Sequence, residues 1–290
     1  MELKNATVIL AIALSSCQWF DPRDVGEREE WQPHVYVNVS LSSDSTFCSF
    51  STPEGWSQST NQQPLDACVQ LQSTSGEQAE GCASGMADAL GFWVPTTAME
   101  SLVLGDSLAL EVSSNLWEDF SAQAAVPSAP AWTGVELGVR TYQEGSKDFD
   151  ELSVHLVQEE EDQKWHLIQL LFQVDTVAAG PPKFQNLRSL DTNVVIRKHG
   201  NSALDNAILL GAEAWEGDEY VLRFHSRNKL DEDVPFHYVL IVQSVSRELF
   251  EFWLDLEAIR QEEELFARSN VDGAGGCFGL TLSESQLVFP

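Results

Sequence analysis

Short runs in which apolar and polar residues alternate constrain the fold of this chain more than any other sequence feature. Residues 34–41 alternate strictly and place four apolar side chains on one face, namely Val35, Val37, Val39 and Leu41. A period of two residues is typical of a half-buried β-strand. Comparable short runs follow at residues 47–51, 67–71, 91–94 and 107–112. The sequence therefore predicts a mainly β protein.

Turn-forming residues separate these runs in the first half of the chain. The segments Thr52-Pro-Glu-Gly55 and Ser73-Thr-Ser-Gly76 hold the proline, glycine and serine residues that favour turns. Several short strands at such spacing are typical of a β-sandwich. We therefore expect an immunoglobulin-like β-sandwich over residues 34–130. Residues 124–131, which include Pro127 and Pro130, form its predicted exit linker.

The second half, residues 131–290, is predicted to be a second β-rich domain. Its strand-like runs, rich in β-branched and aromatic residues, lie at residues 152–157, 165–174, 192–197, 219–224 and 236–243. One amphipathic helix is predicted at about residues 247–263, because Leu249, Trp253, Leu256 and Ile259 follow helical spacing. Ser246 is placed to cap its start. The aromatic residues of this helix either dock on a sheet, which burial statistics favour, or form a partner surface.

The first seventeen residues predict export and lipid attachment. Residues 6–14 are apolar but too few to cross a bilayer, which needs about 20 apolar residues. The next residues, Leu14-Ser15-Ser16-Cys17, match a lipobox, in which the cysteine receives the lipid. We therefore predict a lipoprotein signal peptide at residues 1–16 and a lipidated tether at residues 17–33. The alternative is an ordinary secretory signal that happens to contain a cysteine.

The charge balance excludes one class of partner. The chain carries 45 acidic and 16 basic residues, a net charge of −29. Nucleic-acid binding depends on lysine and arginine that neutralise phosphates, so DNA and RNA are not expected as partners. With 43% hydrophobic and 10% aromatic residues, the chain is expected to fold rather than stay disordered.

Lipidation of Cys17 would leave four cysteines, an even number that suits two disulfides in an exported protein. Cys68 and Cys82 lie symmetrically about Ser75–Gly76, so a hairpin there would bring them face to face. That pairing would leave Cys48 with Cys277. Three pairings are open from sequence alone, and buried thiols are the alternative.

Motifs for catalysis or metal binding are missing from the sequence. It contains no Gly-x-Ser-x-Gly, no His-Glu-x-x-His, no phosphate loop and no zinc spacing. Acidic runs at residues 159–162 and 231–233 are expected to be solvated loops, and the calcium-like start at Asn270 lacks the glutamate needed later. Nine tryptophans suggest sugar stacking, but five of them, Trp56, Trp93, Trp117, Trp132 and Trp215, are predicted to be core plugs or loop anchors. We therefore predict no enzyme activity, no cofactor and no metal site.

Three C-terminal segments carry a family resemblance. They are the Gly-x-x-Tyr turn and strand at residues 217–224, residues 238–246 leading into the predicted helix, and residues 266–279 with Ser269-Asn270 and a glycine-rich ending. In this order they resemble the Bacteroidota outer-membrane lipoprotein family catalogued as domain of unknown function 4249. The lipobox, the strand at residues 35–41, the Gly105–Asp106 turn and Val126–Pro127 fit it too. The chain departs from the family at Cys277, where a small aliphatic residue is expected.

The resemblance implies a lipid-anchored outer-membrane protein, often encoded beside a TonB-dependent transporter, and it carries over no catalytic residue. Asp21 and Asp24, soon after Cys17, favour export to the cell surface, although the periplasmic face is the alternative. The expected role is an accessory or binding subunit of an outer-membrane β-barrel transporter. Alternatives are a stand-alone carbohydrate-binding lipoprotein, with a small-molecule or glycan ligand, and, with least support, a hydrolase.

Lipidation of Cys17 is directly testable. Cells that express the tagged protein and take up an alkyne analogue of palmitate are expected to label it, whereas Cys17→Ser is expected to abolish the label. The same change should move the protein from the membrane fraction to the soluble fraction, because one missing acyl anchor removes most membrane affinity. Cys48→Ser is the matched control and should keep both properties. A membrane-bound, labelled Cys17→Ser protein would show that the lipobox assignment is wrong.

Overall fold

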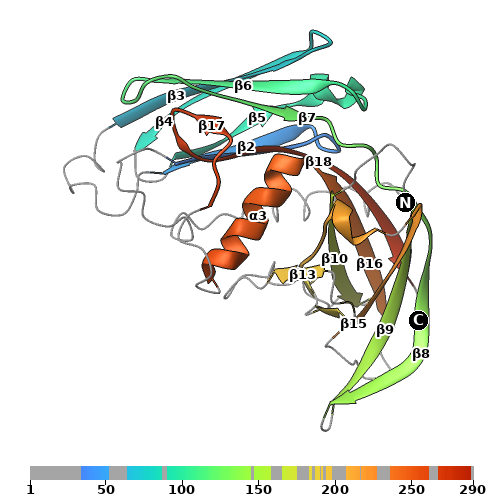
Figure 1. Ribbon diagram of the computed structural model, residues 1–290. Coiled ribbons are helices and arrows are strands. Elements are labelled where there is room, and N and C mark those ends of the chain that lie inside the picture. The colour runs from blue at the N-terminus through green and yellow to red at the C-terminus, as the bar shows by residue number, and fades with distance from the viewer. Residues whose placement is uncertain are drawn as a thin grey trace. The chain divides into compact units, whose positions relative to one another are not determined.

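The computed structural model describes residues 34–51, 64–86, 90–144, 147–157, 165–174, 183–184, 187–189, 191, 194–197, 207–215, 217–226, 236–260 and 267–288. The predicted signal peptide, the tether and Cys17 lie outside them. The described chain is mainly β with several sheets and a helix near its end, which confirms the predicted fold class (Figure 1). It divides into two compact units, Met1–Pro127 with Val245–Leu282 (unit 1) and Ser128–Ser244 with Ser283–Pro290 (unit 2).

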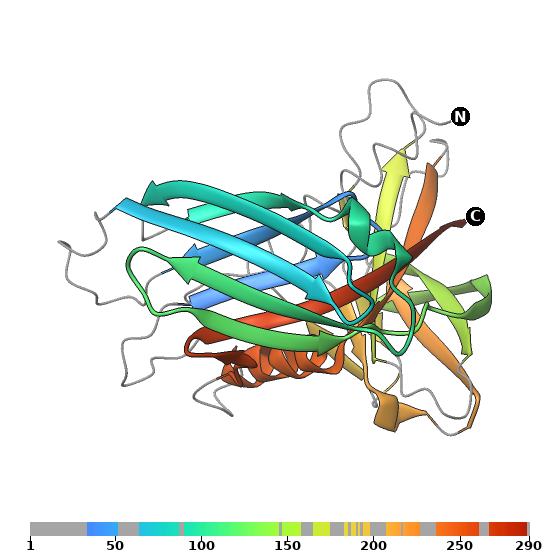
Figure 2. The ribbon, with the colours of Figure 1, turned by 90° about the horizontal axis from the view of Figure 1, so that it is seen from above.

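Unit 1 is a sandwich of two sheets. Its elements are β1 (His34–Ser40), β2 (Ser45–Ser51), β3 (Pro64–Ser73), β4 (Gln78–Met86), β5 (Leu90–Pro95), η2 (Thr97–Ser101), β6 (Ser107–Ser114), β7 (Phe120–Ala125), α3 (Arg247–Arg260), β17 (Val271–Asp272) and the first part of β18 (Gly275–Val288). One sheet has the order β18-β1-β2-β5 and the other β17-β7-β6-β3-β4. Figure 2 shows the long antiparallel strands β3, β6 and β7 side by side.

The core of unit 1 lies between these two sheets. Alternate residues of the strands supply it, among them Val37 on β1, Val69 on β3 and Leu110 on β6, all fully buried. The predicted runs at residues 47–51, 67–71, 91–94 and 107–112 all lie within strands. Alternation in the sequence thus identifies the residues that face the opposite sheet.

Strand β1 is buried on both faces, whereas its alternating pattern predicted a half-buried strand. The second face is covered by α3, since the Tyr36 and Phe252 rings lie 6.2 Å apart. Leu249, Phe252 and Trp253 of α3 are all at most 2% exposed. The helix therefore docks its aromatic face on a sheet, as predicted. The polar residues His34 and Asn38 of β1 are buried with it, which the sequence pattern could not indicate.

Two glycines of β18 allow this packing. Gly276 has φ +115°, and a Cβ there would lie 1.9 Å from the carbonyl oxygen of Val35 on the paired strand β1. A Cβ on Gly279 would lie 2.4 Å from the Cβ of Leu249 on α3. Only glycine adopts such a φ without strain and permits such close approach. The glycine-rich ending of the sequence is therefore a packing requirement of the sheet and helix.

The residues before β18 form a tight, hydrogen-bonded turn. The Asn270 side chain donates to the Phe278 carbonyl (2.7 Å) and accepts from the Phe278 amide (2.9 Å). The Ser269 hydroxyl donates to the Ala274 carbonyl (3.0 Å). Asn270 thus satisfies the backbone of β18 as a neighbouring strand would. The segment at Asn270 that begins like a calcium loop therefore serves to form this turn.

The start of α3 is fixed to the same strand. Ser246 precedes the helix, and its carbonyl accepts the first helical hydrogen bond, from Phe250 (3.1 Å). Its hydroxyl accepts a hydrogen bond from the Leu280 amide (3.2 Å), and its amide donates to the Leu280 carbonyl (2.8 Å). Ser246 lies at the predicted cap position, and its hydroxyl ties the helix to β18.

Unit 2 also contains two sheets. Its elements are β8 (Trp132–Glu144), β9 (Lys147–Val157), β10 (Trp165–Val174), β11 (Lys183–Phe184), β12 (Leu187–Ser189), β13 (Val194–Arg197), β14 (Ala207–Leu210), η3 (Ala212–Ala214), β15 (Glu219–Ser226) and β16 (Phe236–Val245). One sheet runs β13-β14-β10-β16-β18, to which unit 2 contributes the last residues of β18, with β11 beside β10, and the other runs β12-β15-β9-β8. Residues such as Val154, Ile168 and Leu240 form its core.

The division into units corrects the predicted domain boundaries. The change from unit 1 to unit 2 after Pro127 lies close to the predicted boundary at residue 130. Residues 245–282, however, belong to unit 1, so the helix packs in the first unit and not the second. The reason is the parallel pairing of β1 with β18, which returns the C-terminal segment to the first strand. Local sequence patterns do not report such long-range pairing.

The contact between Gly279 and Leu249 generates a stability prediction. Gly279→Ala is expected to lower the free energy of unfolding by about 1–3 kcal/mol, because the added methyl must displace α3 or β18. Gly134→Ala is the control, since a Cβ at Gly134 meets nothing within 4 Å. This surface change in a strand should alter stability by less than about 0.5 kcal/mol. Urea unfolding followed by tryptophan fluorescence measures both, and equal stability of the two variants would contradict the packing described.

Candidate functional site

The first candidate surface is the outer face of the β17-β7-β6-β3-β4 sheet. Cys68 on β3 lies directly opposite Cys82 on β4, and the two form a disulfide, with Cα atoms 4.1 Å apart. The hairpin argument from sequence predicted this pair. The bridge closes a short loop, so by chain entropy it contributes at most about 3 kcal/mol. It lies on the outer face of the sheet, with Cys82 exposed.

The other end of the same hairpin is also fixed. The Ser73 hydroxyl donates to the Glu77 carboxylate, and the Glu77 amide donates back to the Ser73 hydroxyl (2.8 Å). Ser101 donates to the other carboxylate oxygen (3.1 Å). Hydrogen bonds from Ser73 and Ser75 are the largest causes that lower the pKa of Glu77 to about 2. Strands β3 and β4 are therefore held together at the turn and at the disulfide.

The predicted pairing of Cys48 with Cys277 is wrong, because both are buried thiols. Cys48 on β2 lies opposite Val37, and Cys277 on β18 lies opposite Tyr36. Neighbouring residues of one strand point to opposite faces of a sheet. The two thiols therefore lie on opposite faces, with β1 between their strands. Burial raises the pKa of the Cys277 thiol well above its usual value, and its Sγ lies 3.9 Å from the Glu248 carbonyl oxygen.

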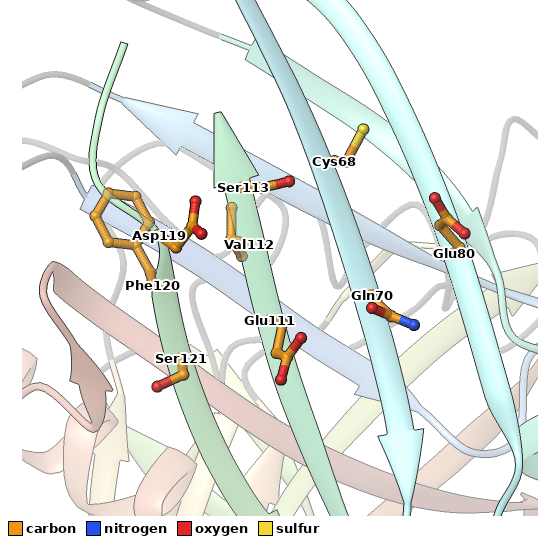
Figure 3. A pocket seen from close by; sticks show the side chains of 9 residues that line it. All are labelled: Cys68, Gln70, Glu80, Glu111, Val112, Ser113, Asp119, Phe120 and Ser121. Carbon is orange, nitrogen blue, oxygen red and sulfur yellow. The ribbon is translucent and has the colours of Figure 1, made fainter. Parts of the chain in front are cut away.

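A shallow depression of about 370 Å³ crosses the outer face near the disulfide (Figure 3). Three carboxylates line it, from Glu80 on β4, Glu111 on β6 and Asp119 before β7, together with polar side chains such as Gln70 and Ser113. Figure 3 shows these side chains standing on neighbouring strands. No group of metal-binding side chains occurs within the described ranges. The depression offers an open, acidic, hydrogen-bonding surface.

The second candidate surface is an aromatic pair on the outer face of the other sheet. Phe47 on β2 lies directly opposite Trp93 on β5, and their ring centroids are 5.2 Å apart at 59°. Trp93 is 42% exposed. A Cβ on Gly91 would lie 2.4 Å from the Phe47 ring, so that ring rests on the backbone of β5. Sequence analysis placed Trp93 as a loop anchor or core plug, and it is instead an exposed strand residue.

The other tryptophans of the prediction differ from Trp93. Trp117 packs against the core of unit 1, and Trp215 is 9% exposed in the core of unit 2. Trp132 packs against the second core and donates its indole N–H to Glu284 (3.1 Å). Trp56 lies outside the described residues. For these three placed residues the predicted role as plugs and anchors agrees with the structure.

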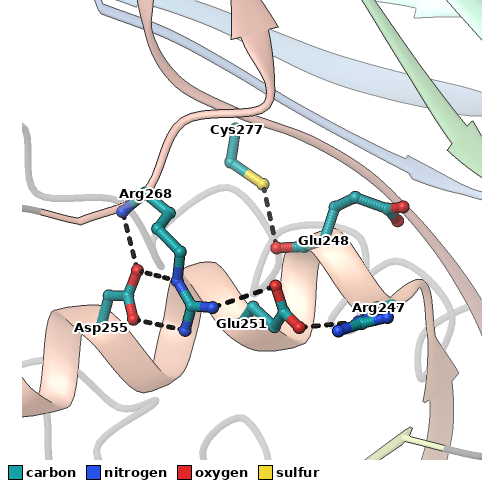
Figure 4. A network of polar contacts seen from close by, with 6 residues as sticks. All are labelled: Arg247, Glu248, Glu251, Asp255, Arg268 and Cys277. Atoms are coloured by element: carbon teal, nitrogen blue, oxygen red, sulfur yellow. Dashed lines mark hydrogen bonds and ion pairs between the residues drawn. The ribbon is translucent and has the colours of Figure 1, made fainter.

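A polar network holds the residues after α3 onto the helix (Figure 4). The Arg268 guanidinium donates to both oxygens of Asp255 (2.8 Å each), and its backbone amide donates to the same carboxylate (2.7 Å). Arg268 also contacts Glu251 (3.2 Å), which accepts from Arg247 (2.7 Å) and raises the pKa of Arg247. The two-oxygen contact to the largely buried Asp255 is the strong one. This network positions the Asn270 turn beside the helix.

Three polar pairs of unit 2 each join a tyrosine or a histidine to a carboxylate, and the pair with His225 is the most buried of the three. Tyr220 donates to Asp191, and burial together with this bond raises the pKa of Tyr220. The buried His225 ring lies 3.7 Å from Glu151. His155 lies 4.0 Å from the exposed Glu136. The acidic runs at residues 159–162 and 231–233 lie outside the described residues. Among the helices of the described chain, none is long and apolar enough to cross a membrane.

Comparison with known proteins identifies no family. No family model matches the chain, and no curated protein matches it. Among solved structures, a collagen adhesin from S. aureus covers 88% of this chain and 93% of its own at 11% identity, with a TM-score of 0.20. The Fcho1 Mu homology domain from Danio rerio with bound Eps15 peptide covers 88% and 95% at 10% identity, with a TM-score of 0.21. TM-scores this low carry no argument about fold or function.

The cysteine assignment is testable by counting thiols. In a Cys17→Ser background, Ellman's reagent is expected to label no thiol in the native protein, because Cys48 and Cys277 are buried. Unfolding without reductant should expose those two thiols, and reduction should then release the pair joined in the Cys68–Cys82 bridge. The matched variant Cys48→Ser should lose one thiol on unfolding. An unfolded protein without any free thiol would restore the Cys48–Cys277 pairing.

Proposed function

We propose that this chain is a non-enzymatic, lipid-anchored protein of the outer membrane, displayed at the cell surface. Its role is that of an accessory or binding subunit of a TonB-dependent β-barrel transporter. The observation that carries the proposal is the lipobox Leu14–Cys17 ahead of a β-rich body. The family resemblance of the C-terminal segments supports the same role.

The tether gives the folded body room to meet a partner. Residues 17–33, fully extended, span at most roughly 60 Å. A body attached through Cys17 therefore reaches a neighbouring barrel without entering the bilayer. The hydrogen-bonded turn at Glu77 and the Cys68–Cys82 bridge fix the β3–β4 hairpin at the edge of its sheet. A fixed surface loses little conformational entropy when it binds, which favours a docking role.

The lining of the acidic depression supports binding more than catalysis. Its titratable side chains are carboxylates of the same charge, Glu80, Glu111 and Asp119. Nucleophilic and general acid–base catalysis most often place a histidine or a lysine beside the reacting group. These three carboxylates stand on an open surface, and neither histidine nor lysine is among the described residues that line it. Hydrogen bonding to a partner is the chemistry that such a surface supports best.

A second candidate function is capture of carbohydrate without a transporter. It is favoured by one observation, the exposed Trp93 ring beside Phe47. Aromatic faces bind the apolar face of sugar rings, and such a site works on an isolated lipoprotein. The two functions make different predictions about what the protein holds when it is purified.

Purification from native membranes tests the transporter role. The tagged protein, extracted in a mild detergent, is expected to bring down a TonB-dependent barrel in about equal amount, identified by mass spectrometry. Purified Cys17→Ser protein, added to detergent-solubilised membranes of a strain that lacks the gene, should capture the same barrel. This control separates protein contact from common residence in lipid. The accessory role would be overturned if the tagged protein were recovered alone. It would also be overturned if the lipidated protein captured the barrel and the Cys17→Ser protein did not.

A further inference from the structure

Trp93 leaves much of its side chain exposed to solvent, at 42%. Among the described residues it is the one aromatic side chain within the group of strongly exposed large apolar residues. Its strand neighbour Val94 is fully buried and supplies the core, so Trp93 points to the opposite face. A tryptophan on a solvated face of a strand exposes apolar area that a polar side chain would avoid. This exposure points to a ligand.

The Trp93 ring packs against the Phe47 ring on the neighbouring strand. Trp93 and Phe47 form a directly opposed cross-strand pair, an arrangement that stabilises antiparallel sheets. The Phe47 ring covers Gly91, where a side chain would collide with it. Such covering of a strand glycine by an aromatic ring is a stabilising device of sheets, so Phe47 has a structural role. Trp93, in contrast, has an open side, and its position is set before any ligand arrives.

On the same face, the nearest described neighbours of the pair along β2 and β5 offer hydroxyl groups and no charge. Ser45 and Ser49 flank Phe47 along β2, and side chains two residues apart share a face. Gly91 and Pro95 flank Trp93 along β5 in the same way. The strand residues of this face around the rings are therefore neutral. A ligand that stacks here meets aromatic surface at its centre and hydroxyl groups at its rim.

The size of the exposed surface decides the kind of ligand. A tryptophan presents at most about 250 Å², so a ring that is 42% exposed offers on the order of 100 Å². A stable protein interface needs about 800 Å² on each partner. The pair is too small to hold a protein by itself, but it matches the face of one sugar ring. The axial C–H groups of a pyranose are weakly positive and pack against the negative face of an aromatic ring.

We propose that Trp93, backed by Phe47, is a stacking platform for a pyranose unit of a neutral glycan. The net charge of −29 repels acidic sugars as they approach the protein surface, which favours neutral ones. The serine hydroxyls of β2 lie on the face where the sugar hydroxyls would need partners. This inference rests on the binding role proposed above, but it does not depend on a transporter.

Affinity gel electrophoresis tests the platform on the full-length protein in a Cys17→Ser background. The native gels contain one neutral polysaccharide each, namely starch, xyloglucan, galactomannan or β-1,3-glucan, and one further gel contains polygalacturonate. At least one neutral polysaccharide is expected to retard the protein, and polygalacturonate is not. Trp93→Ala should weaken the retardation about tenfold, because the stacking surface is lost. Trp93→Phe should weaken it less, since a smaller aromatic face remains.

Matched controls separate the platform from general damage. Leu104→Ala removes an apolar side chain of unit 1 that is 56% exposed, and it should leave the retardation unchanged. The thermal midpoint of Trp93→Ala should fall by no more than a few degrees, because the variant loses one cross-strand pair and no buried core residue. Equal retardation of Trp93→Ala and the parent, or retardation by polygalacturonate alone or by none of the gels, would overturn the platform. Failure to capture a barrel would overturn only the transporter role and leave this result intact.

Discussion

The parallel pairing of β1 with β18 is the interaction on which the rest of unit 1 depends. It places His34 opposite Gly275, which are 241 positions apart in the chain (275 − 34). Closing so long a loop costs entropy, although the cost grows only slowly with loop length. The pairing also requires glycine at one position, since a Cβ at Gly276 would lie 1.9 Å from the Val35 carbonyl oxygen. The fold of the first unit is thus completed by residues near the end of the sequence.

This pairing also decides which surfaces stay open. Because β18 lies beside β1 and leads back to α3 through the Ser246–Leu280 hydrogen bonds, the helix must cover the outer face of these two strands. The aromatic residues of the helix are buried in that contact, and Trp253 is only 1% exposed. The same sheet face continues over β2 and β5, where Trp93 remains exposed. The helix and the aromatic pair therefore share one sheet face. The extent of the helix determines how much of that face, including Trp93, stays exposed.

Local patterns predicted much of the fold, and the misses have physical causes. Many strands with β-branched or aromatic residues were predicted, although β8 and β14, which also contain them, were missed. The Cys68–Cys82 bridge was predicted because a hairpin aligns residues symmetric about its turn. Strand β4 has no such residues, and its Gly81 serves close packing, since a Cβ would lie 2.9 Å from Val94. The pairing of Cys48 with Cys277 failed because the sheet face of each depends on register across β1. Trp93 is exposed because α3 covers another part of the sheet face. A short stretch of sequence around Trp93 does not contain that information.

The proposed anchoring through Cys17 relates the net charge of the chain to the maximum reach of residues 17–33. A net charge of −29 repels an anionic membrane surface, but salt confines this repulsion to about 10 Å at 0.1 M ionic strength. An extended tether of residues 17–33, at most roughly 60 Å long, exceeds that distance several times. Under the proposed lipid anchoring, the acidity would keep the body off the lipid headgroups while residues 17–33 would keep it at the membrane. Surfaces near the aromatic pair gain from this, because a neutral ligand feels little of the repulsion and reaches them freely.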